Sequence, residues 1–107
     1  MEWFSQLSEH DKEIILVKVH LLREFGPELS RPYADTLHGS KTSNMKELRA
    51  RTNGHTFRIA YYFNKKRQGI ILAGGDKNGK DEKLFYKDFI KRAEELMGKY
   101  KEYEWRK

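Results

Sequence analysis

Three arginines lie at positions whose spacing would bring them together on one side of a β-hairpin. Asn53-Gly54 separates two strand-like runs, and this dipeptide favours a two-residue type I′ turn in which both residues have positive φ. Such a turn sets Arg49 opposite Arg58 and places Arg51 on the same face, because side chains alternate along a strand. Like charges directly opposite each other are destabilising. The pattern therefore predicts either an anion site or a cluster that Glu47 holds together.

The other face of this hairpin is apolar and is expected to belong to the core. We predict strands over about 45–52 and 55–63, and the apolar run Ile70–Ala73 predicts a buried third strand beside them. The three strands would form an antiparallel meander. Residues 74–81 are rich in glycine and polar residues, which predicts a flexible loop.

Helices are expected on both sides of the strands. Ser8 resembles an N-cap and Gly26-Pro27 a stop, so the apolar spacing predicts a helix over 8–25. Arg31–Leu37 can form a short second helix. The last helix is expected from Asp81 to about residue 103. Its apolar stripe, at steps of three and four, is Phe85, Phe89, Ala93, Leu96, Tyr100 and Tyr103.

Length and charge limit the class of protein. A chain of 107 residues predicts a single domain over 1–107 with one core. The net charge of +6 is uneven: residues 1–44 hold 5 Lys and Arg against 7 Asp and Glu, whereas residues 45–107 hold 17 against 9. This asymmetry favours a polyanionic partner such as nucleic acid, with a solvated lysine-rich surface as the alternative. No apolar run is long enough for a membrane span, and the absence of cysteine fits a reducing cytoplasm.

Several short segments together resemble one known family. The chain resembles the RelE/HigB superfamily of toxins from type II toxin–antitoxin modules, in particular its phage-derived, HigB-like branch. The segments that carry the resemblance are the LLREFG run ending at Gly26, Arg31–Tyr33, Leu37–Lys41, Asn44–Arg49, Phe57–Ile59, Gly74–Lys77 and Phe85-Tyr86. They are specific jointly and weak singly, and they cover the chain from about Trp3 onward.

The resemblance implies an α+β, RelE-like fold. In this fold a small antiparallel sheet packs with two N-terminal helices and a C-terminal helix. Family members usually have a β-strand ahead of the segment that matches Trp3-Phe4, and this chain starts at Met1. We therefore expect that strand to be absent and one sheet edge to be open, which is a site for pairing with another chain.

The resemblance also implies a reaction. RelE-like toxins cleave mRNA at the ribosomal decoding site, where the RNA's own 2′-hydroxyl attacks the adjacent phosphate. This requires a base, cations around the phosphorane and an acid for the leaving oxygen, but no metal or other cofactor. Carried over by position, the catalytic residues are Arg49 and Arg58 as a phosphate clamp, Lys77 as cation or proton donor, and Tyr86 as base or stacking residue.

Further basic and aromatic residues are expected to bind RNA around this centre. They are Arg51, Lys46, Tyr62, Lys80 and Lys83. The N-terminus of the last helix, near Asp81, would add a positive dipole end that favours phosphate. The implied partners are mRNA on the ribosome and a helix-turn-helix, HigA-like antitoxin in a hetero-oligomer, with translation inhibition and growth arrest as the outcome in the cytoplasm.

Each of these residues also has a purely structural interpretation. Arg49 and Arg58 could pair with Glu47, Asp76 or a helix carboxylate. Lys77 could be an ordinary loop lysine, and Tyr86 could be a packing residue. His55, beside the turn, is expected to be solvated rather than a ligand. The alternative to an endoribonuclease is therefore a non-catalytic module that binds RNA, the ribosome or the antitoxin.

Overall fold

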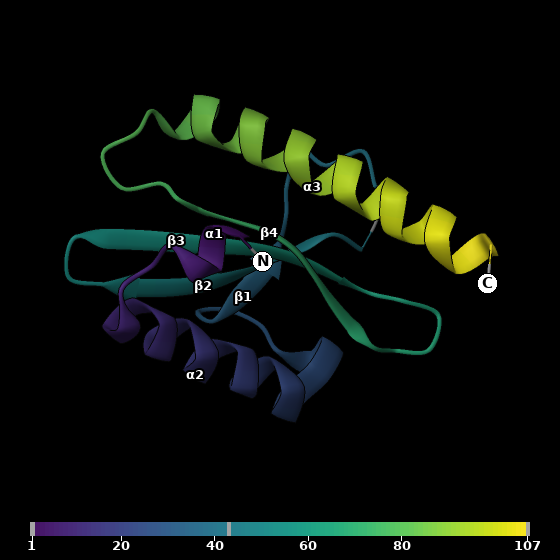
Figure 1. Ribbon diagram of the computed structural model, residues 1–107, viewed down its shortest axis with the longest axis horizontal. Helices are drawn as coiled ribbons and strands as arrows, with labels where there is room; N and C mark the ends of the chain where they lie inside the picture. The colour runs from purple at the N-terminus through teal and green to yellow at the C-terminus, as the bar shows by residue number, and fades with distance from the viewer. Residues whose placement is uncertain (1, 43, 107) are drawn as a thin grey trace.

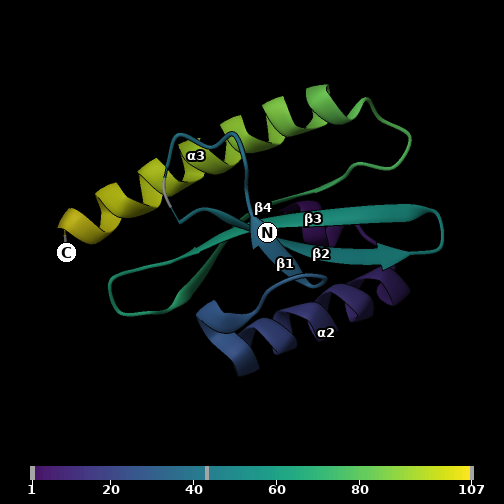
Figure 2. The ribbon, with the colours of Figure 1, turned by 180° about the vertical axis from the view of Figure 1, so that it is seen from behind.

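The computed structural model describes residues 2–42 and 44–106, with side chains as far as Glu102. A four-stranded antiparallel sheet in the order β1-β2-β3-β4 lies between two long helices, with α2 on one face and α3 on the other (Figures 1 and 2). The elements are α1 (Glu2–Ser5), α2 (Glu9–Phe25), the 3₁₀ helix η1 (Gly26–Glu28), β1 (Ala34–Thr36), β2 (Lys46–Thr52), β3 (His55–Phe63), β4 (Gly69–Asp76) and α3 (Glu82–Arg106). The predicted α+β class is confirmed.

The first long helix begins and ends where its capping residues predict. The Ser8 hydroxyl accepts a hydrogen bond from the Asp11 N–H at 3.1 Å, and Gly26, at φ +56°, ends α2 ahead of Pro27. Ile15 and Leu22 are buried against the sheet. Not every apolar residue of the predicted helix is in the core, because Val17 and Phe25 are more than half exposed.

The β2–β3 hairpin has the predicted register but not the predicted turn type. Arg49 pairs with Arg58 and Thr52 with His55. Gly54 has φ +87°, yet Asn53 is not among the residues with positive φ, so a type I′ turn is wrong. A tertiary contact accounts for the difference, since the Asn78 side chain donates to the Gly54 carbonyl at 2.9 Å and ties the turn to the loop after β4.

A fourth strand replaces the predicted second helix. Ala34–Thr36 forms β1 and pairs with Lys46–Leu48, and the peptide bond before Pro32 is cis. The Arg49 N–H extends this pairing by donating to the Tyr33 carbonyl at 2.8 Å. Three residues gain ladder partners and Ala34 becomes fully buried, which outweighs the helical tendency of the segment. The sheet therefore has one strand more than the predicted meander.

Gly74 and Gly75 belong to β4 and not to a flexible loop. A Cβ on Gly74 would lie 2.2 Å from Cε3 of Trp3, and a Cβ on Gly75 would lie 3.0 Å from Cε1 of Phe85. The glycines therefore let α1 approach one face of β4 and α3 the other. Their role in this structure is close packing, which a composition-based interpretation as a loop missed.

The C-terminal helix buries a stripe close to the predicted one. Phe85, Phe89 and Ala93 are buried as expected, and Tyr100 packs at the edge of the same cluster. Met97 takes the core position predicted for Leu96, which is 40% exposed. The side chain of Tyr103 lies outside the described residues. None of the described helices is both long and apolar enough to span a bilayer.

Candidate active site on the β2–β3 hairpin

The predicted arginine pair lies on the sheet face that α3 crosses. Arg49 and Arg58 are cross-strand partners, and Gly75 of β4 lies on the other side of Arg58. The two arginines differ in exposure, because Arg58 is 7% exposed whereas a third of the Arg49 side chain is open to solvent. This face is therefore only partly open to solvent, since α3 covers Arg58 through Tyr86.

Glu47 is the buried carboxylate that joins the two arginines. Its Oε1 lies 3.6 Å from Arg58 Nε and its Oε2 lies 3.3 Å from Arg49 Nη2. Glu47 is 3% exposed, so its charge is not screened by water. This geometry accounts for two guanidinium groups that face each other on adjacent strands.

Tyr86 connects α3 to the same cluster. Its hydroxyl donates to Glu47 Oε1 at 2.8 Å and accepts from Arg58 Nε at 3.2 Å. Burial, followed by the neighbouring carboxylate, raises the pKa of Tyr86 to about 12. The phenol therefore keeps its proton at neutral pH and is a donor in this state, which disfavours the predicted role as a base.

Asp35 of β1 is a second anion beside Arg49. Its Oδ2 lies 3.5 Å from Arg49 Nη2 and 2.7 Å from Arg31 Nη2. The hydrogen bond from Arg31 is the largest of the effects that lower the pKa of Asp35. Another Arg49 nitrogen, Nε, is buried with no hydrogen-bond partner among the described residues.

Lys77 approaches the cluster from the loop after β4. Its Nζ lies 5.7 Å from the centre of the Tyr86 ring and 2.7 Å from Glu82 Oε1. The hydrogen bond from Lys77 is the main cause that lowers the pKa of Glu82. Folding thus brings together all four predicted catalytic residues, from β2, β3, the β4–α3 loop and α3.

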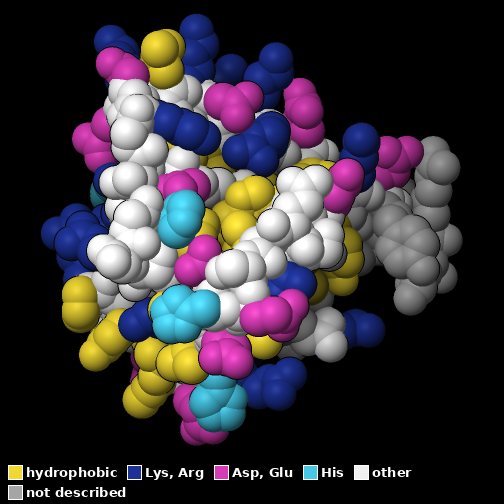
Figure 3. Space-filling model, turned by 60° about the vertical axis from the view of Figure 1, so that its left-hand side comes forward, with side chains coloured by type: hydrophobic (Ala, Val, Ile, Leu, Met, Phe, Trp, Pro, Cys, Tyr) yellow, Lys and Arg dark blue, Asp and Glu magenta, His cyan; other side chains and the backbone are white. Residues whose placement is uncertain are grey.

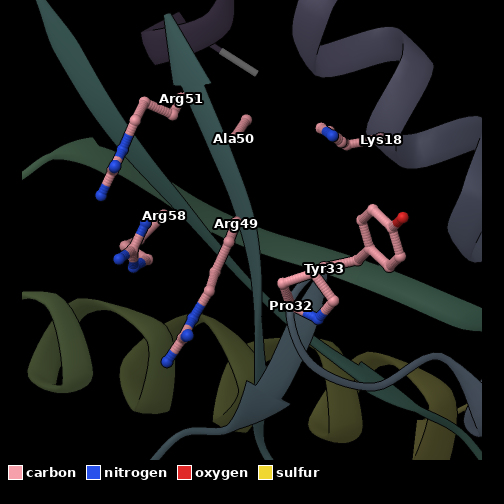
Figure 4. Close-up of a pocket in the computed structure, with 7 residues that line it drawn as sticks. All are labelled: Lys18, Pro32, Tyr33, Arg49, Ala50, Arg51 and Arg58. Atoms are coloured by element: carbon pink, nitrogen blue, oxygen red, sulfur yellow. The ribbon is translucent and has the colours of Figure 1, made fainter.

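A pocket of about 390 Å³ opens beside the arginines. Figure 4 shows Arg49, Arg51 and Arg58 on one side of β2 and Lys18 and Tyr33 on the other; Pro32 and Ala50 complete the lining. The guanidinium of Arg51 makes no ion pair with any residue in the described part of the chain. Cationic donors that protein acceptors leave unused are what an oxyanion requires.

The other predicted RNA-binding residues are not gathered in this pocket. Tyr62 is 3% exposed in the core beneath α3, so the prediction that it contacts RNA is wrong. Lys46 alternates onto the face that packs against α2. Lys80 lies over the Phe85 ring at 5.8 Å and lines a separate pocket, and Lys83 is exposed in the first turn of α3.

The N-terminus of α3 already has an anionic partner. The Asp81 carboxylate accepts the Leu84 N–H at 2.9 Å. This cap takes the place that a phosphate would need, so the predicted phosphate site at this helix end is not supported.

His55 forms a second charged cluster at the tip of the hairpin. Its Nδ1 donates to Asp76 Oδ2 at 2.6 Å, and its Nε2 lies 3.7 Å from Asp11 Oδ2. The hydrogen bond to Asp76 is the main cause that raises the pKa of His55. The prediction of a merely solvated histidine is therefore incomplete, although 45% of its side chain remains exposed. In Figure 3, which turns this side of the molecule forward, histidine and carboxylate side chains adjoin one another.

Sequence reasoning missed Asp35, Lys18 and Tyr33 as neighbours of the arginines. Asp35 was assigned to a helix, and only the β1–β2 register places it beside Glu47. No motif marks Lys18, which reaches the pocket from α2. Across the described ranges 2–42 and 44–106, no three His, Asp or Glu side chains meet in a metal-binding arrangement.

Comparison with known proteins identifies related sequences. The family described as "Phage derived protein Gp49-like" matches residues 2–98. Two proteins of Mycobacterium tuberculosis (strain ATCC 25618 / H37Rv) are similar. "Putative toxin HigB2" is 36% identical over 99 residues, and "Putative toxin HigB3" is 40% identical over 77 residues.

The alignments cover a larger share of this chain than of either relative. The alignments include 92% and 72% of this chain, but 49% of HigB2 and 66% of HigB3. The chain therefore spans about half the length of the first relative and about two thirds of the second. No solved structure matches it. The resemblance to the phage-derived, HigB-like branch is confirmed.

Proposed function

The chain belongs to the phage-derived Gp49-like family, and from that premise we propose that it is the toxin of a toxin–antitoxin pair that cleaves mRNA. The names of the HigB2 and HigB3 relatives support the toxin role. The observation that carries the chemistry is the convergence of Arg49, Arg51 and Arg58 on one pocket. The partner would be a helix-turn-helix, HigA-like antitoxin, and the site of action would be the translating ribosome in the cytoplasm.

The proposed reaction is a transesterification within the RNA. The 2′-hydroxyl gives up its proton to a base, and its oxygen forms a bond to the adjacent phosphorus. The bond from phosphorus to the 5′-oxygen breaks, and that leaving oxygen takes up a proton from an acid. The products are a 2′,3′-cyclic phosphate and a 5′-hydroxyl. Arg49 and Arg51 would bind the phosphate oxygens. The buried Arg58 would add positive charge that stabilises the negative charge of the phosphorane.

We assign proton transfer to Tyr86, with Glu47 as its hydrogen-bond partner. The Tyr86 hydroxyl already donates to Glu47 at 2.8 Å, so the pair forms a short path from a donor to a carboxylate. With a pKa of about 12, Tyr86 holds its proton at neutral pH and is assigned here as the donor to the leaving oxygen. Lys77, whose ammonium lies over the Tyr86 ring, adds positive charge on that side.

A binding module without catalysis is the second candidate, and one observation favours it. Glu47 neutralises much of the charge of both arginines, as in a structural ion-pair network. Such a module would bind RNA, the ribosome or an antitoxin and would leave RNA intact.

The test is cleavage of RNA by the purified chain in the presence of a metal chelator, with and without ribosomes. The termini are mapped for 2′,3′-cyclic phosphate and 5′-hydroxyl groups. Arg49→Ala is the informative variant because Arg49 is partly exposed. Arg23→Ala is the matched control, since it removes an exposed guanidinium from α2 beside a different pocket.

We expect cleavage to fall by roughly 100-fold in Arg49→Ala and to be unchanged in Arg23→Ala. A single 2′-deoxy nucleotide at the mapped site should abolish cleavage there. Binding of RNA without new termini, on and off the ribosome, would favour the non-catalytic module. Equal cleavage by wild type and Arg49→Ala would remove the arginine cluster from the mechanism.

A further inference from the structure

The pocket beside the arginines reaches around the edge of β2 to a part of the molecule that the proposed reaction does not use. Its lining combines the three arginines on one side of β2 with Lys18 and Tyr33 on the other (Figure 4). β1 pairs with Lys46–Leu48, and Tyr33 just before it accepts the Arg49 N–H. Beyond Arg49 the strand β2 has no outer neighbour strand, and the pocket opens at this edge. Ala50, which is 2% exposed and has only a methyl side chain, lines the pocket at this edge.

Tyr33 is held in place through its backbone, while its ring is partly exposed beside Lys18. Its carbonyl accepts the Arg49 N–H at 2.8 Å, and its own N–H donates to the Ser30 carbonyl at 3.0 Å. The residue is 42% exposed, and Lys18 Nζ lies 5.2 Å from the centre of its ring. An exposed aromatic ring next to an ammonium that pairs with none of the described carboxylates provides the two kinds of group that bind a base and its phosphate in single-stranded RNA.

We infer that Tyr33 and Lys18 form a second nucleotide subsite, adjacent to the arginine cluster across the edge of β2. The Tyr33 ring stacks on a nucleobase that neighbours the scissile phosphate, and Lys18 pairs with the phosphate of that nucleotide. The strand then crosses the open half of β2 with one nucleotide on each side. This inference rests on the proposed function and adds to it the residues that recognise a flanking base.

The test uses a short RNA that is 2′-O-methylated throughout, which blocks the attacking oxygen and leaves binding intact. Fluorescence anisotropy is measured for wild type, Tyr33→Ala, Tyr33→Phe and Lys18→Ala. Base stacking on an aromatic ring predicts a loss of affinity of roughly 5- to 150-fold for Tyr33→Ala. Tyr33→Phe keeps the ring and should stay within about twofold of wild type. For Lys18→Ala, the slope of log K against log salt should fall by about 0.7, the value for one phosphate on a single strand.

An abasic scan separates stacking from damage to the fold. At one position of the RNA, removal of the base should weaken binding to wild type as much as Tyr33→Ala does, and should weaken Tyr33→Ala no further. The inference is overturned if Tyr33→Ala binds as wild type, if Tyr33→Phe loses as much as Tyr33→Ala, or if no position shows this coupling. It is also overturned if Tyr33→Ala weakens binding of a polyglutamate peptide and not of RNA.

Cleavage of unmodified RNA distinguishes this inference from the function on which it rests. If the subsite is correct, Tyr33→Ala raises KM and leaves kcat nearly unchanged, because the stacked base does not react. If wild type cleaves RNA and Tyr33→Ala has the same KM, only the subsite is wrong. If wild type neither binds nor cleaves RNA, the proposed function fails and the subsite with it.

Discussion

The middle and the tip of the β2–β3 hairpin each contain a cluster of charged groups, and the two clusters differ in what they leave unused. At the tip, His55 lies between the carboxylates of Asp11 and Asp76, and Asp76 also accepts the Thr56 and Asn78 N–H groups. In the middle, neither the buried Arg49 Nε nor the Arg51 guanidinium has a partner among the described residues.

The comparison shows that charge alone does not mark a binding site. Acidic and basic side chains meet in both clusters. At the tip two carboxylates face one imidazole, and Asp76 also accepts two backbone N–H groups. There these side chains join α2, β3 and β4 and stabilise the hairpin. In the middle the guanidinium donors exceed the acceptors that Glu47 and Asp35 offer, and a pocket adjoins them. Unused donors beside a pocket are therefore the more informative signal.

The largest effect is expected from removing the acid of the middle cluster. Glu47→Ala leaves Arg58 and the Tyr86 hydroxyl buried without their carboxylate, which should lower the free energy of unfolding by about 3–5 kcal/mol. Urea denaturation monitored by circular dichroism measures this. Glu82→Ala is the control, since Glu82 forms an exposed ion pair with Lys77 and its removal should lower the free energy of unfolding far less. Equal losses in the two variants would show that the middle cluster is no more than a surface network.

Much of this arrangement follows from the sequence. The Asn53-Gly54 signal fixes the cross-strand pair Arg49 and Arg58, and the Ser8 and Gly26 caps fix α2, because these are local effects. The strand β1 could not be predicted, since a three-residue strand owes its existence to the edge of β2. The glycines of β4 were wrongly predicted as part of a loop. Their packing role depends on Trp3 and Phe85, which are distant from at least one of them in sequence.

The sequence predicts which residues form the site, but not which of them α3 buries. Alternation along strands places the three arginines on one face, and the family resemblance adds Lys77 and Tyr86. Which part of that face α3 covers depends on tertiary packing, so the burial of Arg58 and Tyr62 was not foreseen. For the same reason the sequence pattern does not predict Lys18 and Tyr33 as part of the site. They reach the pocket from the other side of β2.

A smaller, pH-dependent effect is expected at the tip. The pKa of His55 is raised in the folded chain, so the protonated imidazole stabilises the fold below its unfolded pKa of about 6.5, and this contribution is lost as the pH rises through the folded pKa. His55→Gln should therefore lower Tm at pH 5.5 and have less effect at pH 8.5. Thermal unfolding at both pH values measures the difference. A gap between the two proteins that is the same at pH 5.5 and 8.5 would contradict a charged His55 between Asp11 and Asp76.

The smallest effect on stability, and the sharpest contrast with the tip, is expected from Arg51. Its guanidinium pairs with none of the described residues, so Arg51→Ala should change the free energy of unfolding by less than about 0.5 kcal/mol. The same variant should lower the slope of log K against log salt for a 2′-O-methylated RNA by about 0.7, since one phosphate contact is lost. Arg67→Ala, in the β3–β4 turn, removes an equal charge far from the pocket and should leave this slope unchanged. If both variants reduce the slope equally, RNA senses the overall positive charge of the chain rather than the unused donors of the middle cluster.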